Sequence, residues 1–438
     1  MLKMMFLLLS LLNALLVLSL SFTENANRKE NTTLLLVQAL FRHGDRAPIA
    51  LYKNDPNAKV HWPGGLGKLT RAGKKHHYAL GKFLRSMYKT YLTSNPKEVI
   101  VNSSAVDRCV RGAEVTVAAL YEPEGIWKFE DDLIWQPIPI YYLPEDQDKY
   151  MVYRSACPRG FQESARLINS EERLELIRKH QKMLEEVSNY TEMDISREMI
   201  LFLYDTLNIE KTHNLAIPTL IDNYYDEIQE FAEETFKIFF GSDLILRLRI
   251  GPFLQKISEN MKKKINGDIP DLKIQLYCAQ DVNLNAVFAA LNFTNMPRAP
   301  YCATLLFELH EMADALMAVR LLYLNSTDPL TMGEPHVLIL DDCSEYCPLS
   351  NFTKKFQRLI PDNWEQECRT STSDSRMYEW KPSFEARQRV ADRNFIEKFP
   401  RVPTPSQHQF QENTSSFVDA SQTCRTDTQM LESPKTLH

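Results

Sequence analysis

The residues best suited to chemistry lie in one short segment, Arg42-His43-Gly44-Asp45-Arg46. Two arginines this close can converge on one phosphate, because each guanidinium offers a fixed fork of N–H donors. Their charge should lower the pKa of the intervening histidine and keep its imidazole neutral and nucleophilic. Gly44 lets a ligand approach the backbone closely, and Asp45 could orient an arginine or the imidazole. The segment predicts a phosphate site; the alternative is a surface turn in which Asp45 pairs with Arg42 or Arg46.

The element that must position this segment is the apolar run directly before it. Leu34 to Phe41 has the length and composition of a strand that is buried on both faces of an α/β sheet. Ligands bind at the carboxyl ends of strands in such sheets, which is where the segment falls. Further along the chain, the pattern predicts helices over residues 70–91, 109–121 and 283–291, and strands over residues 99–101 and 272–278.

The domain organisation follows from a change of character in the middle of the chain. Between about Gln162 and Lys264 the segments are amphipathic, rich in Glu, Lys and Leu, and short of strand signals. We therefore predict a mainly helical domain at residues 151–264, inserted into an α/β core formed by residues 34–150 and 265–370. Residues 371–438 are polar and are predicted to be a disordered tail.

The N-terminus is typical of a signal peptide. Lys3 precedes an apolar run from Phe6 to Leu20, and cleavage is predicted after Ser21, so that the signal peptide is residues 1–21. The alternative is a membrane anchor, because the run approaches a bilayer-spanning length. No later run is comparable, so no transmembrane anchor is expected in the mature chain.

Cysteines and glycosylation sequons agree with export. Eight cysteines fit an oxidising compartment. The predicted glycosylation sites are Asn31, Asn102, Asn189, Asn292, Asn325, Asn351 and Asn413.

Composition and the remaining motifs exclude several other functions. The net charge of -6 and pI near 6.0 argue against a general nucleic-acid binder. His310-Glu311 resembles the start of a zinc-binding helix, but the second histidine would fall at Asp314. His76 and His77 are interpreted as structural. We predict no metal site and no cofactor.

Several further motifs, in order along the chain, carry a family resemblance. They are WPGGLGKLTRAGKKHHYALG (62–81), SAVDR (104–108), WQPIPI (135–140), YCAQD (277–281) and DNWEQEC (362–368). Together with the arginine-histidine segment, they resemble the histidine acid phosphatases, most closely those of the animal prostatic and lysosomal type. The resemblance implies a phosphoglycerate-mutase-like mixed sheet flanked by helices. It also implies hydrolysis of phosphate monoesters in the secretory pathway, with an extracellular or lysosomal location and a possible homodimer.

The resemblance assigns a role to each residue that matches a family motif. His43 matches the nucleophile that becomes phosphorylated, and Arg42 and Arg46 match its flanking phosphate ligands. Arg108 matches a third phosphate-binding arginine, from a later loop. Asp281 matches the general acid that protonates the leaving alkoxide.

The chain departs from the family pattern at Gln280, where the family has a histidine. An amide cannot carry a positive charge, and the loss of one preorganised donor costs roughly 3 to 4 kcal/mol, or about 10² to 10³ in rate. Gln280 recovers part of this if its amide points at the phosphate. We expect weakened catalysis; the alternative is a catalytically degenerate member that acts as an anion-binding glycoprotein.

The family also implies disulfides and one local structure. Cys157 matches the partner of Cys368, and Cys343 the partner of Cys347. The pairing of the cysteines left over stays open: Cys109, Cys278, Cys302 and Cys424. Cys109 and Cys278, which adjoin Arg108 and the Gln280-Asp281 pair, are expected to be buried free thiols. Propensity favours a helix over residues 304–324, but the family places two strands and a turn there, and we follow the family.

Overall fold

The computed structural model describes residues 32–153, 157–293 and 296–370. Five predictions lie outside these residues: the signal peptide (1–21), the tail (371–438), Asn31, Asn413 and Cys424. None of the helices within the described ranges is long and apolar enough to cross a membrane.

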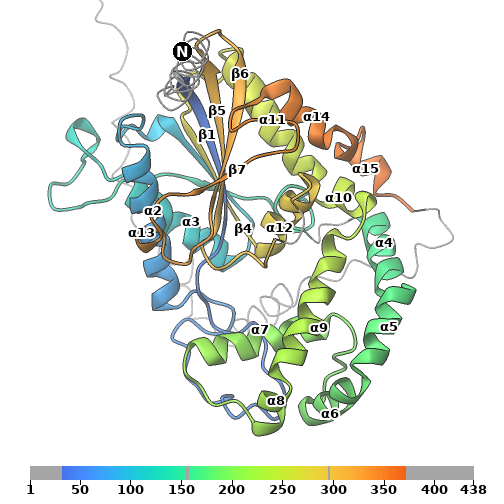
Figure 1. Cartoon of the computed structure of the whole chain (residues 1–438). Helices are drawn as coiled ribbons and strands as arrows, with labels where there is room; N and C mark the ends of the chain where they lie inside the picture. The colour runs from blue at the N-terminus through green and yellow to red at the C-terminus, as the bar shows by residue number, and fades with distance from the viewer. Residues whose placement is uncertain (1–31, 154–156, 294–295, 371–438) are drawn as a thin grey trace, which may run out of the picture. The chain divides into compact units, whose positions relative to one another are not determined.

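A mixed sheet forms the centre of the structure (Figure 1). The neighbouring strands run in the order β3-β2-β4-β1-β5-β6-β7, and β8 pairs with β6. The strands from β3 to β1 are parallel, and those from β1 onward are antiparallel. Their bounds are β1 Thr32–Arg42, β2 Val99–Ser103, β3 Ile140–Tyr141, β4 Ile274–Ala279, β5 Thr304–Met312, β6 Met317–Leu324, β7 His336–Leu338 and β8 Cys347–Pro348.

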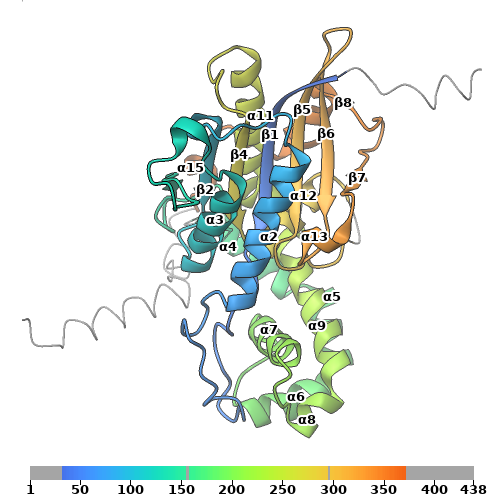
Figure 2. The same ribbon diagram turned by 90° about the vertical axis from the view of Figure 1, so that its left-hand side faces the viewer.

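Helices cover both faces of this sheet, so the predicted α/β fold with a mixed sheet is confirmed (Figures 1 and 2). α2 and α3 pack on one face, and α11, α12 and α14 on the other. The helix bounds are α2 Arg71–Met87, α3 Asp107–Leu120, α4 Pro158–Ile168, α5 Glu171–Lys179, α6 Gln181–Thr191, α7 Met199–Thr212, α8 Thr219–Asn223, α9 Tyr225–Lys237, α10 Asp243–Arg249, α11 Gly251–Ile265, α12 Asp281–Ala290, α13 Pro329–Met332, α14 Leu349–Phe356 and α15 Trp364–Glu367.

The strand β1 lies in the interior of the sheet and is buried on both faces. Leu36 and Leu40 belong to the apolar core beneath α11 and α12. Val37, Ala39 and Phe41 belong to the core beneath α2 and α3. Successive side chains of a strand point to opposite faces, so this near-continuous apolar run is what a doubly covered strand requires. The arginine-histidine segment therefore starts from a rigid base.

The helices between α4 and α9 include a second core of their own. Val187, Leu203 and Phe231 are fully or almost fully buried there, together with Tyr52 from the loop that follows β1. All but the last residue of α11 falls inside the stretch 151–264 that was predicted as an insertion, but this helix packs against the sheet. The described chain thus holds a sheet core and a smaller helical core.

The family-based expectations for residues 304–324 and for the disulfides agree with the structure. Residues 304–324 form β5 and β6 rather than a helix. The disulfides Cys157–Cys368 and Cys343–Cys347 are both present. Three of the remaining cysteines are buried free thiols: Cys109, Cys278 and Cys302.

Candidate active site

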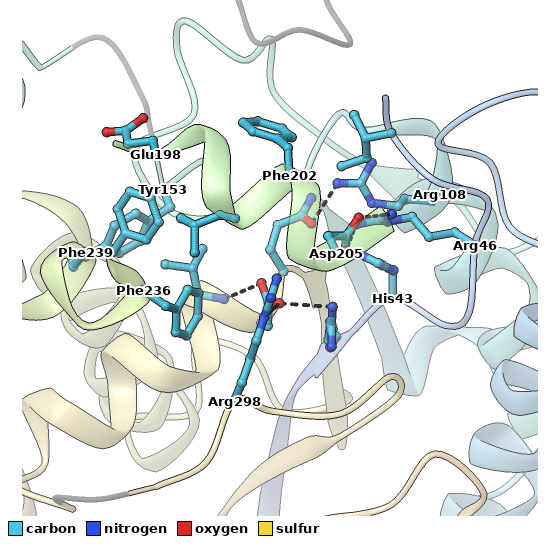
Figure 3. A pocket seen from close by; sticks show the side chains of 16 residues that line it. His43, Arg46, Arg108, Tyr153, Glu198, Phe202, Asp205, Phe236, Phe239 and Arg298 are labelled. Carbon is cyan, nitrogen blue, oxygen red and sulfur yellow. Dashed lines mark hydrogen bonds and ion pairs between the residues drawn. The ribbon is translucent and has the colours of Figure 1, made fainter. Parts of the chain in front are cut away.

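A pocket opens at the carboxyl ends of β1 and β4 (Figure 3). The sheet ends supply its charged floor, and the helical region supplies much of its apolar wall. Its lining residues are Arg42, His43, Arg46, Ile49, Arg108, Tyr153, Glu198, Leu201, Phe202, Asp205, Phe236, Phe239, Gln280, Asp281, Val282 and Arg298. All six residues predicted for the site, from three separate stretches of sequence, line this one pocket.

His43 is buried and its tautomer is fixed by the backbone. Its Nδ1 lies 2.8 Å from the carbonyl oxygen of Gly44. A carbonyl only accepts, so Nδ1 carries the proton and Nε2 keeps its lone pair. Burial, and then the positive charges of Arg108 and Arg42, hold the pKa of His43 well below its usual value. The imidazole is therefore neutral in mildly acidic solution, as a nucleophile must be.

Arg42 is held in place on three sides. Its guanidinium donates to the carbonyl oxygen of Ala299 at 2.8 Å, pairs with Asp281 at 3.0 Å, and lies 4.4 Å from the centre of the Tyr301 ring. Burial lowers its pKa, an effect that Asp281 partly opposes. These contacts fix the orientation of the guanidinium before any ligand arrives.

Arg46 is fixed by a carboxylate that the sequence did not reveal. Its two terminal nitrogens lie 2.9 Å from the two oxygens of Asp205 on α7, a bidentate ion pair. Burial raises the pKa of Asp205, but the charge and hydrogen bonds of Arg46 outweigh it and leave that pKa lowered. The helical region thus contributes directly to the phosphate site.

Arg108 and Gln280 contact each other across the pocket. The terminal nitrogen Nη2 of Arg108 donates to Oε1 of Gln280 at 2.8 Å. The amide nitrogen of Gln280 then points toward the sulfur of Cys109, 3.6 Å away. In this arrangement Gln280 orients an arginine, and one of its two N–H donors is directed at Cys109.

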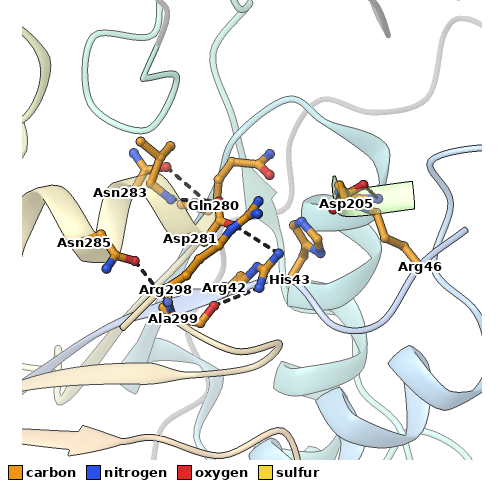
Figure 4. Close-up of polar contacts among 12 residues, drawn as sticks. Arg42, His43, Arg46, Asp205, Gln280, Asp281, Asn283, Asn285, Arg298 and Ala299 are labelled. Carbon is orange, nitrogen blue, oxygen red and sulfur yellow. Dashed lines mark hydrogen bonds and ion pairs between the residues drawn. The ribbon is translucent and has the colours of Figure 1, made fainter. Parts of the chain in front are cut away.

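Asp281, at the first turn of α12, lies between two guanidinium groups (Figure 4). Its Oδ2 is 3.0 Å from Arg42 and 2.6 Å from Nε of Arg298. Burial raises the pKa of Asp281, but Arg298 and then Arg42 outweigh burial and hold it below its usual range. Asp281 is therefore ionised in the ligand-free protein.

His77 and Gly44 explain why the segment after β1 keeps its shape. The backbone N–H of Gly44 donates to Nε2 of His77 at 2.8 Å, and Nδ1 of His77 lies 2.9 Å from the Thr116 hydroxyl. Burial lowers the pKa of His77 to about 3, so it stays neutral. A Cβ at Gly44 would lie 2.6 Å from the carbonyl oxygen of Gly73, which excludes any larger residue. The interpretation of His77 as structural fits this geometry.

Asp45 contacts neither the arginines of the segment nor His43, contrary to the options that we considered from the sequence. Its carboxylate accepts a short hydrogen bond from Thr70, the N-cap of α2, and faces Nε2 of His213 at 3.1 Å. Asp45 therefore ties the segment to α2 and to the end of α7.

Three contributors to the pocket were missed by the sequence reasoning: Asp205, Arg298 and the aromatic wall of Tyr153, Phe202, Phe236 and Phe239. Asp205 lies in the mostly apolar helix α7, as a single carboxylate with no motif around it. Arg298 follows Pro297 in a loop with no motif. Only the tertiary structure brings these residues to His43.

Comparison with known proteins assigns the family. The family model described as "Histidine phosphatase superfamily (branch 2)" matches residues 33–324. The chain belongs to this superfamily, since the match covers more than half of its length.

Among similar proteins are acid phosphatases. Lysosomal acid phosphatase of Xenopus laevis is 33% identical over 372 residues, which cover 83% of this chain and 84% of the relative. Prostatic acid phosphatase of Homo sapiens is 31% identical over 351 residues, covering 78% and 89%. A solved structure of Hafnia alvei phytase in its apo form has the same fold, with a TM-score of 0.57 and 18% identity, and covers 78% of this chain and 99% of that chain.

Proposed function

We propose that this protein is an acid phosphatase that hydrolyses phosphate monoesters through a phosphohistidine at His43. The observation that carries this proposal is the state of His43. It is a buried, neutral imidazole whose proton is fixed on Nδ1, at a pocket that Arg42, Arg46 and Arg108 also line.

In the first step, Nε2 of His43 attacks phosphorus and the ester P–O bond breaks. Nδ1 keeps its proton, and the Gly44 carbonyl stabilises the charge that develops on the imidazole. The three arginines stabilise the charge on the phosphoryl oxygens. In the second step, water attacks the phosphohistidine, which releases inorganic phosphate and restores the neutral histidine.

Asp281 donates the proton that the leaving alkoxide takes, and it regains one from the attacking water. Because two arginines hold it ionised without a ligand, its pKa must rise when substrate binds. A phosphate group that draws Arg42 toward its own oxygens supplies that rise. The acid is then protonated only when a substrate is present.

The geometry of Gln280 favours a weakened enzyme. Its carbonyl oxygen accepts from Arg108 and one of its two N–H groups points toward Cys109, so at most one donor is left for the phosphate. The same observation keeps the second candidate open, an anion-binding glycoprotein without turnover, because the arginine pocket does not depend on catalysis.

We further propose that the protein acts in the secretory pathway, extracellularly or in the lysosome. Four of the predicted glycosylation sites are exposed, Asn189, Asn292, Asn325 and Asn351, whereas Asn102 is half-buried in β2 and accepts a hydrogen bond from Gln275. The proposed homodimer has a candidate surface beside the edge strand β3, where these large apolar side chains are exposed: Ile126, Phe129, Leu133, Ile134, Trp135, Tyr141, Tyr142 and Leu143.

Hydrolysis of an aryl phosphate between about pH 4 and 6 tests this function. An aryl group suits the aromatic wall of the pocket. If the protein is an acid phosphatase, we expect turnover that disappears in His43→Ala and rises in Gln280→His. If the native chain gives no more product than His43→Ala while Gln280→His gains activity, the hypothesis of an enzyme is wrong and that of an anion-binding glycoprotein replaces it.

A further inference from the structure

Arg298 belongs to a loop that is held firmly against α12. The side chain of Asn285 accepts a hydrogen bond from the backbone N–H of Ala299 at 3.0 Å and donates to the carbonyl oxygen of Pro297, also at 3.0 Å. One buried asparagine thus clamps the backbone on both sides of Arg298. These two hydrogen bonds therefore fix where the backbone of Arg298 lies.

The side chain of Arg298 reaches the pocket beside Phe236 of the aromatic wall (Figure 3). Its guanidinium lies 5.0 Å from the centre of the Phe236 ring, and its Nε bonds Asp281 at 2.6 Å. The side chain is only 25% exposed. Within the described ranges its terminal nitrogens make no hydrogen bond, so the outer edge of the fork is available to a ligand.

The charges of the pocket show why this arginine matters. Four arginines line the pocket: Arg42, Arg46, Arg108 and Arg298. Two aspartates, Asp205 and Asp281, lie beside them, so the net charge of these six side chains is +2, with Glu198 at the rim left out. Without Arg298 the net charge of the remaining five side chains would be +1. A phosphate monoester carries one to two negative charges, with its second pKa near 6. Gln280 is uncharged and cannot replace the positive charge of the family histidine, so the net charge of +2 depends on Arg298.

We propose that Arg298 is a phosphate-binding residue that replaces the positive charge absent at position 280 and reaches the substrate from the side of its leaving group. The inference rests on the proposed function. Arg298 and position 280 are brought together by Asp281, which follows Gln280 in the chain and bonds Arg298 directly (Figure 4). When the guanidinium of Arg298 also binds a phosphate oxygen, its positive charge is shared between the phosphate and Asp281. The carboxylate of Asp281 is then less stabilised and becomes easier to protonate.

A double-mutant cycle tests this replacement. Binding of inorganic phosphate at pH 5 is measured by calorimetry for the native chain, Arg298→Gln, Gln280→His and the double variant. A hydrogen bond to a charged group is worth about 1.5 to 3 kcal/mol, so Arg298→Gln should weaken phosphate binding roughly 10- to 100-fold in the native background. In the Gln280→His background the same change should cost no more than about threefold, because the histidine then supplies the cation.

Equal losses in the two backgrounds, or no loss in either, overturn the proposal. Arg298→Lys keeps the charge but not the fork, and is expected to lie between native and Arg298→Gln. Arg173→Gln is the control, because Arg173 is another arginine stacked on a phenylalanine, Phe231, but lies outside the pocket. It should leave phosphate binding unchanged.

The readout separates this inference from the proposed function. Phosphate binding needs no turnover, so a protein that hydrolyses nothing still reports whether Arg298 and position 280 are interchangeable. Conversely, an active enzyme whose phosphate affinity ignores Arg298 retains the proposed function and loses only the inference.

Discussion

Asp205 and Glu210 lie on the same helix, α7, and both are buried, yet their surroundings act on them in opposite directions. Asp205 faces Arg46, which outweighs burial and leaves its pKa lowered. Glu210 faces Asp55 and Tyr52 instead; burial raises its pKa to about 8, and Asp55 adds to the rise while Asn57 opposes it. Burial is common to both, so a counter-cation decides the ionisation state.

The two positions also differ in how their oxygens are satisfied. Both oxygens of Asp205 accept from Arg46. Among the described residues, neither oxygen of Glu210 nor Oδ2 of Asp55 has a well-placed donor. Two ionised carboxylates offer only acceptors, so this pair needs a shared proton. The carboxylate of Asp205 thus holds an arginine in place, whereas Glu210 and Asp55 hold a proton.

The largest effect is expected for Asp205→Asn, which removes the carboxylate that forms a bidentate ion pair with the buried guanidinium of Arg46. Breaking such a pair costs on the order of 3 to 5 kcal/mol of unfolding free energy. At pH 5 the matching carboxyl-to-amide change, Glu210→Gln, should cost less than about 1 kcal/mol, because the carboxyl is already neutral. Thermal unfolding of both variants at pH 5 makes the comparison; equal losses would contradict it.

The next effect concerns pH. Glu210 binds its proton more tightly in the folded chain than in the unfolded chain, whose pKa stays near 4.5. Its contribution to stability is therefore complete below about pH 4.5 and is lost as pH rises toward 8, by on the order of 2 to 4 kcal/mol.

The measurement is the unfolding midpoint between pH 5 and pH 8, compared between the native chain and Glu210→Gln. The variant should lose most of the downward slope. Glu185→Gln, at an exposed position on α6, is the control and should keep it. A slope that Glu210→Gln leaves intact would rule out the shared proton.

A smaller effect is expected for Arg108→Gln. After burial, Arg108 is the largest cause of the lowered pKa of His43, so its removal lets that pKa rise toward the usual value. The acid limb of the kcat/KM profile should then move to higher pH, and the lost phosphate contact should cost about 2 kcal/mol in kcat/KM. Glu210→Gln should leave the limb where it is.

The smallest effect is expected for Tyr52→Phe. The buried Tyr52 hydroxyl has no hydrogen-bond partner among the described residues. Its removal should therefore change the unfolding free energy by less than about 1 kcal/mol. A cost well above this would show that the hydroxyl donates to the carboxyl pair, and that the pair holds less proton than we infer.

How far the sequence predicted the molecule depends on the range of the interactions involved. The strand before His43 and the helix after Thr70 were predictable, because their apolar spacing and capping are local. Helix propensity gave the wrong structure for residues 304–324, because their Leu- and Met-rich composition does not show that β5 lies between β1 and β6. Family likeness corrected this, since it carries tertiary information.

The site residues divide in the same way. His43, Arg42 and Arg46 share one local motif, whereas Asp205 and Arg298 reach the pocket through packing that no spacing encodes. Asp45 shows the limit within the motif itself. Its neighbours in sequence suggested a role beside the imidazole, but its partners, Thr70 and His213, come from other elements.

The position of β1 in the sheet has a consequence for synthesis. Its hydrogen-bonded neighbours are β4 and β5, which begin at Ile274 and Thr304, so the first strand made must wait for partners that emerge far later. At roughly 5 to 20 residues per second, Arg298 follows His43 by about 10 to 50 s. During that interval the nucleophile, its arginines and an apolar strand are exposed together without a fold. A product truncated before β4 and β5 would therefore carry the catalytic motif but no catalytic site.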